Sequence, residues 1–282
     1  MNAPTLLALP NRKSFPKSLA PAAAEVTAVV SASRLKCYMT CRRQFYFRYM
    51  LGLKKPAGAA LIVGQALHRM LEIWNHARWH GDNPTLATSL ERFEEEWQTI
   101  VEAQAVAWKD DKDEPKQKAT ALRLWQAWLE KPPIPEEETP EGVEVYLEHE
   151  EVTSDRPKII GYLDLVRAGG LLVEFKTSAR STNADELAHQ HRLQLTIYAL
   201  LYRESTWQQE KGVQVIQLIK TKEPKIEVFT FPPATDKDFE ELDATIHAFK
   251  EGVSNGDFSM SPGQHCSWCD YRAECMAKVA SN

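Results

Sequence analysis

The sequence contains no long apolar run. None of the apolar stretches among its 282 residues approaches the roughly 20 residues that a membrane-spanning helix needs. The run from Leu6 to Leu9 is followed by Pro10 and is too short for the core of a secretion signal, so we expect a cytoplasmic protein without a membrane partner. The Gly-x-x-x-x-Gly-Lys-Ser/Thr pattern of a phosphate-binding loop is also missing, so the chain does not predict a helicase motor.

Cysteine is scarce, and its positions are informative. In a cytoplasmic protein, the 5 cysteines are expected to be metal ligands or free thiols rather than disulfides. Cys266, Cys269 and Cys275 form a C-x2-C-x5-C pattern, which indicates a metal site. A tetrahedral zinc ion or a [4Fe–4S] cluster needs a fourth ligand, which Cys41 or Cys37 has to supply. The residues alone leave both metals, and a site without metal, open.

Acidic residues are absent from residues 31–55, although the whole chain has a net charge of -5. Glutamates gather instead in residues 136–151. One basic segment on an acidic protein is compatible with a track for phosphate groups, and equally with an ordinary basic helix face. Its basic residues are Arg34, Lys36, Arg42, Arg43, Arg48, Lys54 and Lys55.

A hairpin is predicted over residues 161–177. Its turn falls at residues 168–170, where two glycines supply the positive φ angles that a tight turn needs. A turn centred on Gly169 places Asp164 directly opposite Glu174, and the alternation of side chains along a strand puts Lys176 on the face of Glu174. The opposite, core-facing side chains are Leu171, Val173 and Phe175.

Two facing carboxylates repel each other unless something neutralises them. Mg²⁺ and Mn²⁺ prefer carboxylate, carbonyl and water oxygens, so Asp164 and Glu174 predict a divalent-cation site. Lys176 could then hold a water molecule or stabilise charge on a phosphate. The alternative is a solvated strand face that carries a Glu–Lys ion pair.

The rest of the chain predicts helices and strands around this hairpin. Phe45 and Tyr49 are expected in the core, as are Leu67, Met70, Leu71 and Trp74 of the second helix. Trp97, Trp108, Trp125 and Trp128 of a helical insertion indicate core packing or an interaction surface.

The strand before the hairpin carries Glu148 and Glu150, for which we expect a solvated edge. The predicted segments are a disordered leader over 1–25, a strand over 26–30, a helix from the N-cap Ser33 to about Leu51, a helix over 62–80, an insertion over about 81–140, strands over 143–152, 213–220 and 225–231, and helices over 186–203 and 236–252.

The Asp-x9-Glu-x-Lys pattern across a hairpin resembles the active site of the PD-(D/E)XK nuclease superfamily. Gln194 and Tyr198 resemble the Gln-x-x-x-Tyr motif of its RecB-like branch, and Gly64 to His68 resemble its Gly-x-x-x-His motif. That branch includes the nuclease domains of bacterial RecB and AddB and small CRISPR-associated nucleases with an iron–sulfur cluster. The similarity runs from about residue 31 to residue 275, and Arg42 stands where relatives usually have proline after the cysteine.

The resemblance implies an α/β, restriction-endonuclease-like fold, in which a central mixed sheet is flanked by helices, as one nuclease domain over 26–282. It implies Mg²⁺ or Mn²⁺ at His68, Asp164, Glu174 and the Phe175 carbonyl, with Lys176, Gln194 and Tyr198 in catalysis. It also implies a [4Fe–4S] cluster, with zinc as the alternative, at a clasp of residues 266–275 and Cys41. The iron–sulfur ligands would be Cys41, Cys266, Cys269 and Cys275, and the DNA contacts Arg42, Arg43, Arg48 and Tyr198.

The activity that the resemblance implies is hydrolysis of DNA by an exonuclease on single-stranded ends, in DNA repair, recombination or defence. One alternative is trimming of prespacers beside a CRISPR integrase. Another is a non-catalytic DNA-binding or scaffold module beside a helicase, which the intact Asp164, Glu174 and Lys176 disfavour.

Overall fold

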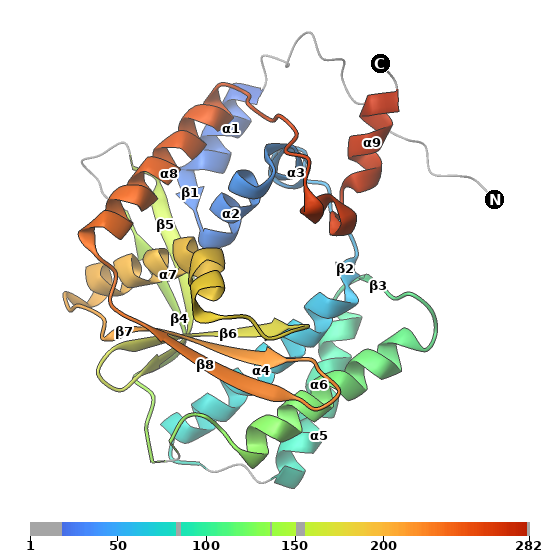
Figure 1. Ribbon diagram of the computed structural model, residues 1–282, viewed down its shortest axis with the longest axis vertical. Helices are drawn as coiled ribbons and strands as arrows, with labels where there is room; N and C mark the ends of the chain where they lie inside the picture. Colours follow the sequence, from blue (N-terminus) through green and yellow to red (C-terminus); the bar gives the residue numbers. More distant parts are fainter. Residues whose placement is uncertain (1–18, 83–85, 136, 151–155, 281–282) are drawn as a thin grey trace. The chain divides into compact units, whose positions relative to one another are not determined.

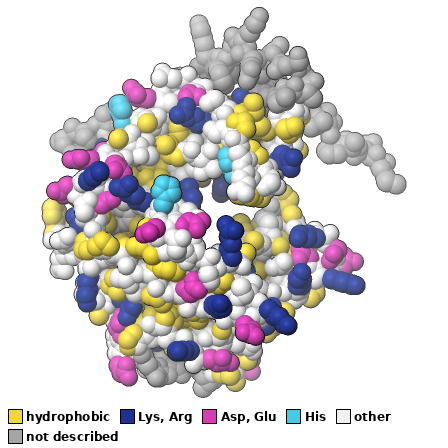
Figure 2. Space-filling model, viewed as in Figure 1, with side chains coloured by type: hydrophobic (Ala, Val, Ile, Leu, Met, Phe, Trp, Pro, Cys, Tyr) yellow, Lys and Arg dark blue, Asp and Glu magenta, His cyan; other side chains and the backbone are white. Residues whose placement is uncertain are grey.

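The computed structural model describes residues 19–82, 86–135, 137–150 and 156–280 (Figure 1). The chain divides into two compact units, one formed by Met1–Val30, Arg34–Leu53 and Ala244–Asn282, and a larger one formed by Ser31–Ser33 and Lys54–Asp243. No helix among the described residues has the length and apolar character needed to cross a bilayer. On the face shown in Figure 2, positive and negative side chains are interspersed, so the net charge of -5 does not gather there as one patch.

A mixed β-sheet forms the centre of the larger unit, which confirms the predicted fold class. Strands β4 and β5, β5 and β6, and β7 and β8 pair antiparallel, whereas β6 and β7 pair parallel. The parallel pair is connected through helix α7 (Ala184–Thr206). The strands are β4 (Gly142–His149), β5 (Lys158–Arg167), β6 (Leu171–Ser178), β7 (Gly212–Ile219) and β8 (Lys225–Phe231).

Helices α4 (Ala59–Trp79) and α6 (Asp113–Glu130) lie on one side of this sheet, and α7 lies on the other (Figure 1). Leu67, Met70, Leu71 and Trp74 of α4 are all buried, as the apolar spacing predicted. The remaining elements on this side are α5 (Leu86–Glu102) and the short parallel strands β2 (Ala57–Gly58) and β3 (Val106–Ala107).

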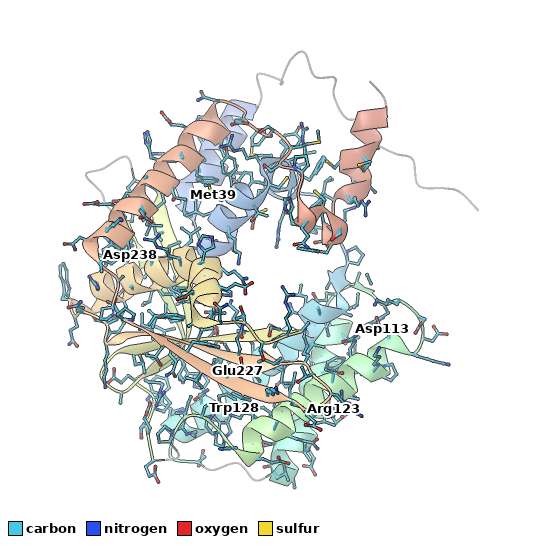
Figure 3. The ribbon with its side chains drawn as sticks, viewed as in Figure 1. Met39, Asp113, Arg123, Trp128, Glu227 and Asp238 are labelled. Atoms are coloured by element: carbon cyan, nitrogen blue, oxygen red, sulfur yellow. The ribbon has the colours of Figure 1, made fainter. Side chains whose placement is uncertain are left out.

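The predicted insertion is part of the core. Trp128 lies between α6 and the sheet (Figure 3), where its ring meets those of Trp74 and Phe175 edge-on, with centroid distances of 5.5 and 5.6 Å. Trp97 and Trp125 are also buried, and Trp108 is half-buried. The tryptophans therefore pack the core, and the back of the predicted catalytic hairpin rests on one of them.

The hairpin has the predicted register. Leu165 pairs with Val173 and Arg167 with Leu171, as a turn centred on Gly169 requires. Gly169 and Gly170 have φ angles of 74° and 73°, in the left-handed region that favours glycine. Leu171 is only half-buried, whereas Val173 and Phe175 are buried as predicted.

We predict that Gly170→Ala destabilises the hairpin strongly. A Cβ at this position would lie 2.4 Å from the Tyr202 hydroxyl oxygen, in addition to the strain of a positive φ. We expect the free energy of unfolding to fall by about 2–4 kcal/mol, from roughly 1–2 kcal/mol of backbone strain and a similar overpacking term. Urea denaturation measures this loss. Gly81→Ala is the matched control, because Gly81 has a φ of 80° with nothing within 4 Å; an equal loss in both variants would refute the packing argument.

The smaller unit differs from the sequence prediction at two places. Leu19–Ala28 form helix α1, so the strand expected over 26–30 is reduced to β1 (Val29–Val30); alanine-rich sequence with proline in the first turn favours this helix. The expected disordered leader over 1–25 is therefore helical over 19–25, and its residues 1–18 lie outside the described residues. The helix expected from Ser33 to Leu51 is instead α2 (Ala32–Thr40), α3 (Arg42–Phe45) and the π-helix η1 (Tyr46–Met50). Ser33 therefore lies inside α2, and its predicted N-cap role is wrong.

Cys41 interrupts that helix because its backbone is extended, with φ -158° and ψ 110°. The amide of Arg43 then donates to the Ser259 carbonyl at 3.1 Å instead of continuing the helix. The core of this unit is aromatic: Phe45 and Tyr38 meet each other and Phe249 of α8 edge-on, with ring centroids 5.2–5.4 Å apart. Phe45 is buried as predicted, and Tyr49 is half-buried. The last elements are α8 (Asp236–Ser254), η2 (Gln264–Trp268) and α9 (Arg272–Ala280).

Candidate active site

Asp164 and Glu174 lie inside the larger unit, where they are only 8% and 2% exposed. The alternative of a solvated strand face is therefore wrong for the two acids, although the Glu–Lys ion pair that it included is present between Glu174 and Lys176. The regular β5–β6 ladder stops at Leu165 and Val173, one position before the two acids. Beyond this point, the Phe175 N–H donates to a side chain instead of a backbone carbonyl. Its acceptor is Oδ2 of Asp164, at 2.7 Å. The bond fixes one oxygen of Asp164 and links it to the strand that carries Glu174.

His68 approaches the other oxygen of Asp164. Its Nδ1 lies 3.5 Å from Asp164 Oδ1, on a helix turn whose neighbours Leu67 and Leu71 are buried. Burial lowers the pKa of His68, but the charge and contact of Asp164 and the charge of Glu174 outweigh it and raise the pKa to about 9. A metal ligand must be a neutral imidazole, so a cation bound here displaces a proton.

Glu174 has one satisfied and one unsatisfied oxygen. Oε1 accepts hydrogen bonds from Lys176 Nζ and, at 2.9 Å, from Gln194 Nε2. Oε2 is fully buried and has no hydrogen-bond partner among the residues that the structure describes. Burial and the charge of Asp164 raise the pKa of Glu174 to about 7, against the opposing effect of Lys176. A buried carboxylate oxygen without a partner is costly, and it is the kind of ligand that a hard cation takes.

Helix α7 supplies the two polar residues predicted beside the hairpin. Asn183 caps the helix, since its side chain accepts the Glu186 N–H at 2.8 Å. Gln194 then reaches Glu174, and its Nε2 also donates to the Tyr198 hydroxyl at 2.7 Å. Tyr198 is 7% exposed, and burial followed by the charge of Glu174 raises the pKa of its phenol. Its hydroxyl therefore faces the carboxylate network, and its predicted contact with DNA stays a prediction.

Glu144 is a site residue that sequence reasoning missed. Its carboxylate, the carboxylate of Asp164 and the imidazole of His68 offer ligand atoms that all lie within 4.8 Å of one another. Among the described residues, this group does not include Glu174. Burial, then the charges of Asp164 and Glu72, raise the pKa of Glu144 to about 7. The position of Glu144 in the strand before the hairpin could have indicated a role in the site. The alternation of apolar and polar residues along that strand instead assigned Glu144 to the solvated face. Glu148, on the same strand, is exposed and pairs with Lys158 at 2.8 Å, as expected of a solvated edge.

The donor set of this site fits a divalent cation. It combines the imidazole of His68 with the buried carboxylate of Asp164 and the half-buried carboxylate of Glu144. Glu174, outside this group, adds a buried oxygen that has no hydrogen-bond partner among the described residues. Carboxylates suit Mg²⁺ and Mn²⁺, and an imidazole favours Mn²⁺ of the two.

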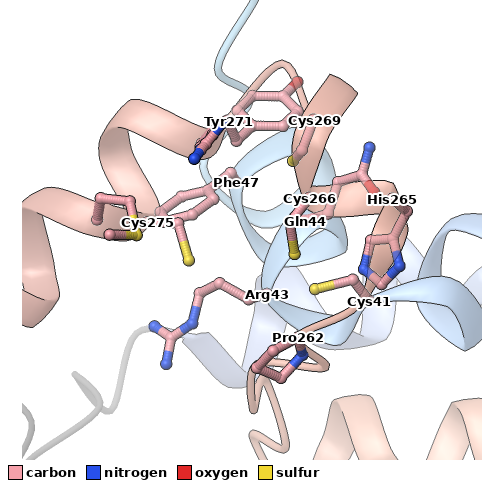
Figure 4. Close-up of a pocket in the computed structure, with 12 residues that line it drawn as sticks. Cys41, Arg43, Gln44, Phe47, Pro262, His265, Cys266, Cys269, Tyr271 and Cys275 are labelled. Carbon is pink, nitrogen blue, oxygen red and sulfur yellow. The ribbon is translucent and has the colours of Figure 1, made fainter.

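A separate pocket in the smaller unit brings four cysteines together (Figure 4). Cys41, Cys266, Cys269 and Cys275 all line a cavity of about 230 Å³. Cys37 is buried but does not line it, and burial raises the pKa of its thiol to about 11 despite the opposing charge of Arg48. The cavity is many times larger than the space that one water molecule needs.

The predicted DNA-binding arginines lie in the smaller unit and differ in their surroundings. Arg42 forms an ion pair with Asp257 and lies over the ring of Tyr38. Arg43 lines the cysteine pocket, and Arg48 lies over the ring of Tyr49. Arg42 therefore already has an acidic partner, which weakens its prediction as a phosphate contact.

Comparison with known proteins gives a family and a fold. A family model described as the PD-(D/E)XK nuclease superfamily matches residues 29–276. The chain is similar to a crystal structure described as "Putative exonuclease" from Eubacterium rectale, with 14% identity, a TM-score of 0.55, and coverage of 92% of this chain and 94% of that chain. A crystal structure of SSO0001 matches with 14% identity, a TM-score of 0.43, and coverage of 93% and 96%. No curated protein matches the sequence. At 14% identity, the similarity to the Eubacterium rectale structure supports the fold alone. The family is shown by the match to the family model.

Proposed function

The chain belongs to the PD-(D/E)XK nuclease superfamily, and on this basis we propose that it is a Mg²⁺- or Mn²⁺-dependent deoxyribonuclease. The observation that carries the proposal is the pair of buried carboxylates, Asp164 and Glu174, beside the amine of Lys176. Two buried acids are costly in a module that only binds DNA, whereas a nuclease can use them to hold a cation that promotes phosphodiester hydrolysis.

The proposed cation ligands are His68, Asp164, Glu174 and the Phe175 carbonyl. A divalent cation, when bound, lowers the pKa of a water molecule and neutralises charge on the phosphate. The support is the unpartnered Oε2 of Glu174 and the orientation of Asp164, whose Oδ2 is held by the Phe175 amide while Oδ1 faces His68.

Lys176 is proposed to orient the attacking water or to stabilise the charge that develops on the phosphate. Its ammonium already contacts Glu174, so it stands at the edge of the proposed cation site. Gln194 and Tyr198 are positioning residues in this proposal, because Gln194 donates both to Glu174 Oε1 and to the Tyr198 hydroxyl, and Tyr198 thereby helps to hold Gln194 against Glu174.

We further propose that the substrate is DNA with free ends, and that the enzyme is an exonuclease acting on single strands in repair, recombination or defence. The likeness to the RecB motif at Gln194 and Tyr198 supports this, and the structural neighbour described as an exonuclease is consistent with it. Arg43 and Arg48 stay predicted DNA contacts. A helicase or CRISPR integrase partner stays a prediction.

The test is digestion of end-labelled linear DNA, single- and double-stranded, beside covalently closed circles of the same sequence. We expect degradation of the linear single strand with Mg²⁺ or Mn²⁺, none with EDTA, and none of the circle. Cleavage of the circle would refute the exonuclease proposal while leaving a nuclease. A folded protein that cleaves nothing with either metal would refute the nuclease proposal.

For the cysteine pocket we propose a [4Fe–4S] cluster held by Cys41, Cys266, Cys269 and Cys275, as in the RecB/AddB-like branch. The support is that these four thiols line one cavity while Cys37 stands outside it. Its role would be to tie residues near Cys41 to the C-terminal segment within the smaller unit. The proposed nuclease domain over 26–282 includes this clasp.

A further inference from the structure

Glu144 has a conformation that its strand does not require. The β4–β5 ladder pairs Val143 with Leu165 and Val145 with Leu163, but the intervening Glu144 and Asp164 are not paired. Glu144 has a φ of 48°, in the left-handed region that side chains other than glycine rarely adopt. Strain of this kind persists only where the surrounding structure imposes it, and such positions cluster at functional sites.

The surroundings of Glu144 are negatively charged. Burial, then the charges of the acidic residues Asp164, Glu72 and Glu174, raise its pKa, whereas the charge of His68 lowers it. Its carboxylate makes no hydrogen bond or ion pair with the described residues. Glu148, on the same strand, is instead neutralised by Lys158 and accepts the Tyr146 hydroxyl at 2.6 Å. Glu144 therefore lacks the protein partner that an ordinary surface glutamate of this strand has.

An independent observation indicates that a ligand belongs here. Glu174 is 2% exposed, and its charge acts on both His68 and Glu144. Within the described part of the chain, its buried Oε2 has no hydrogen-bond partner. A divalent cation would satisfy this oxygen and neutralise the surrounding carboxylates together.

We propose that Glu144 is a direct ligand of the catalytic cation site, together with His68 and Asp164. The inference rests on the proposed function and adds a ligand from β4 that the Asp-x9-Glu-x-Lys pattern does not contain. Its geometric basis is that the three residues offer ligand atoms within 4.8 Å of one another. One imidazole with two carboxylates is a donor set that Mn²⁺ accepts readily.

The experiment measures Mn²⁺ binding to the full chain by calorimetry, without DNA. We expect Glu144→Gln to raise the Mn²⁺ dissociation constant at least about tenfold, since even partners behind a metal ligand are worth roughly 10–100-fold. Glu148→Gln makes the same change on the same strand and is expected to alter the constant less than about twofold, as befits a surface ion pair.

A second variant separates binding from folding. Glu144→Gly removes the carboxylate and also the strain of the positive φ, so in EDTA it should melt at or above the wild-type temperature while binding Mn²⁺ as weakly as Glu144→Gln. Wild-type affinity in either variant, or an equal loss in Glu148→Gln, would overturn the proposal.

The outcome is distinct from that of the nuclease test. A wild-type enzyme that cleaves DNA while Glu144→Gln binds Mn²⁺ normally would leave the nuclease standing and remove Glu144 from the site. Mn²⁺ binding that depends on Glu144, in a protein that cleaves nothing, would support the ligand and refute the nuclease.

Discussion

Lys176→Ala should reduce the rate of DNA cleavage by roughly 100- to 10,000-fold, the range expected for loss of a group that moves a proton or stabilises transition-state charge. Lys176 Nζ contacts Glu174 Oε1, so its removal takes the nearest positive charge away from the site. Initial rates on a labelled single strand at saturating Mg²⁺ measure the effect. We expect the loss in kcat rather than in KM, because the proposed role of the amine is in the reaction and not in holding DNA.

The same variant separates catalysis from metal binding. Removing an ammonium beside a cation site takes away a repulsive charge, so Lys176→Ala should bind Mn²⁺ at least as tightly as the wild type. A large fall in rate together with retained Mn²⁺ affinity is the expected pair of results. If Mn²⁺ affinity fell with the rate, Lys176 would be supporting the fold of the site rather than the chemistry.

Lys158→Ala is the matched control. Lys158 lies on β5, and its side chain is 28% exposed, against 26% for Lys176, but its partner is the surface residue Glu148. An exposed ion pair contributes on the order of 0–1 kcal/mol, so we expect cleavage within about twofold of the wild type. Cleavage that survives Lys176→Ala at the level of Lys158→Ala would show that the nuclease site has been assigned to the wrong residues.

The hairpin could be predicted from the sequence because its information is local. Two adjacent glycines fix the turn, the turn fixes the register, and the register determines which residues face Asp164. The buried positions of α4 were predictable for a similar reason, since one helix face carries all four apolar residues. The α/β class follows from these two patterns and the strands after them.

What could not be predicted depends on contacts between distant segments. The break at Cys41 lies in a helical sequence, and it coincides with a hydrogen bond from the Arg43 amide to Ser259, more than 200 residues away. Glu144 sits in a strand whose alternation places it with the exposed Tyr146 and Glu148, and only its left-handed backbone brings it to His68 and Asp164. Local patterns give ideal strands and helices, whereas functional sites often depend on departures from them.

The second large effect is expected at the cysteine pocket. Anaerobically purified protein should contain about four irons and four sulfides per chain, as a [4Fe–4S] cluster requires. Cys266→Ala should abolish this content and lower the melting temperature of the protein by roughly 20 °C or more. A structural metal site contributes on the order of 10 kcal/mol to folding, and each kcal/mol moves the midpoint by roughly 2–4 °C in a chain of this size.

Cys37→Ala is the control that gives this experiment its meaning. Cys37 is as buried as Cys41, at 9% against 8% exposed, but only Cys41 lines the pocket. The iron content of Cys37→Ala should therefore match that of the wild type, whereas Cys41→Ala should lose iron as Cys266→Ala does. If the purified protein contained one zinc ion per chain instead of iron, the four thiols would form a single-ion zinc site and not a cluster site. Iron lost from Cys37→Ala and retained in Cys41→Ala would reverse the assignment of the fourth ligand. Such a result would mean that the chain bends at Cys41 for packing and not to present its thiol to the pocket.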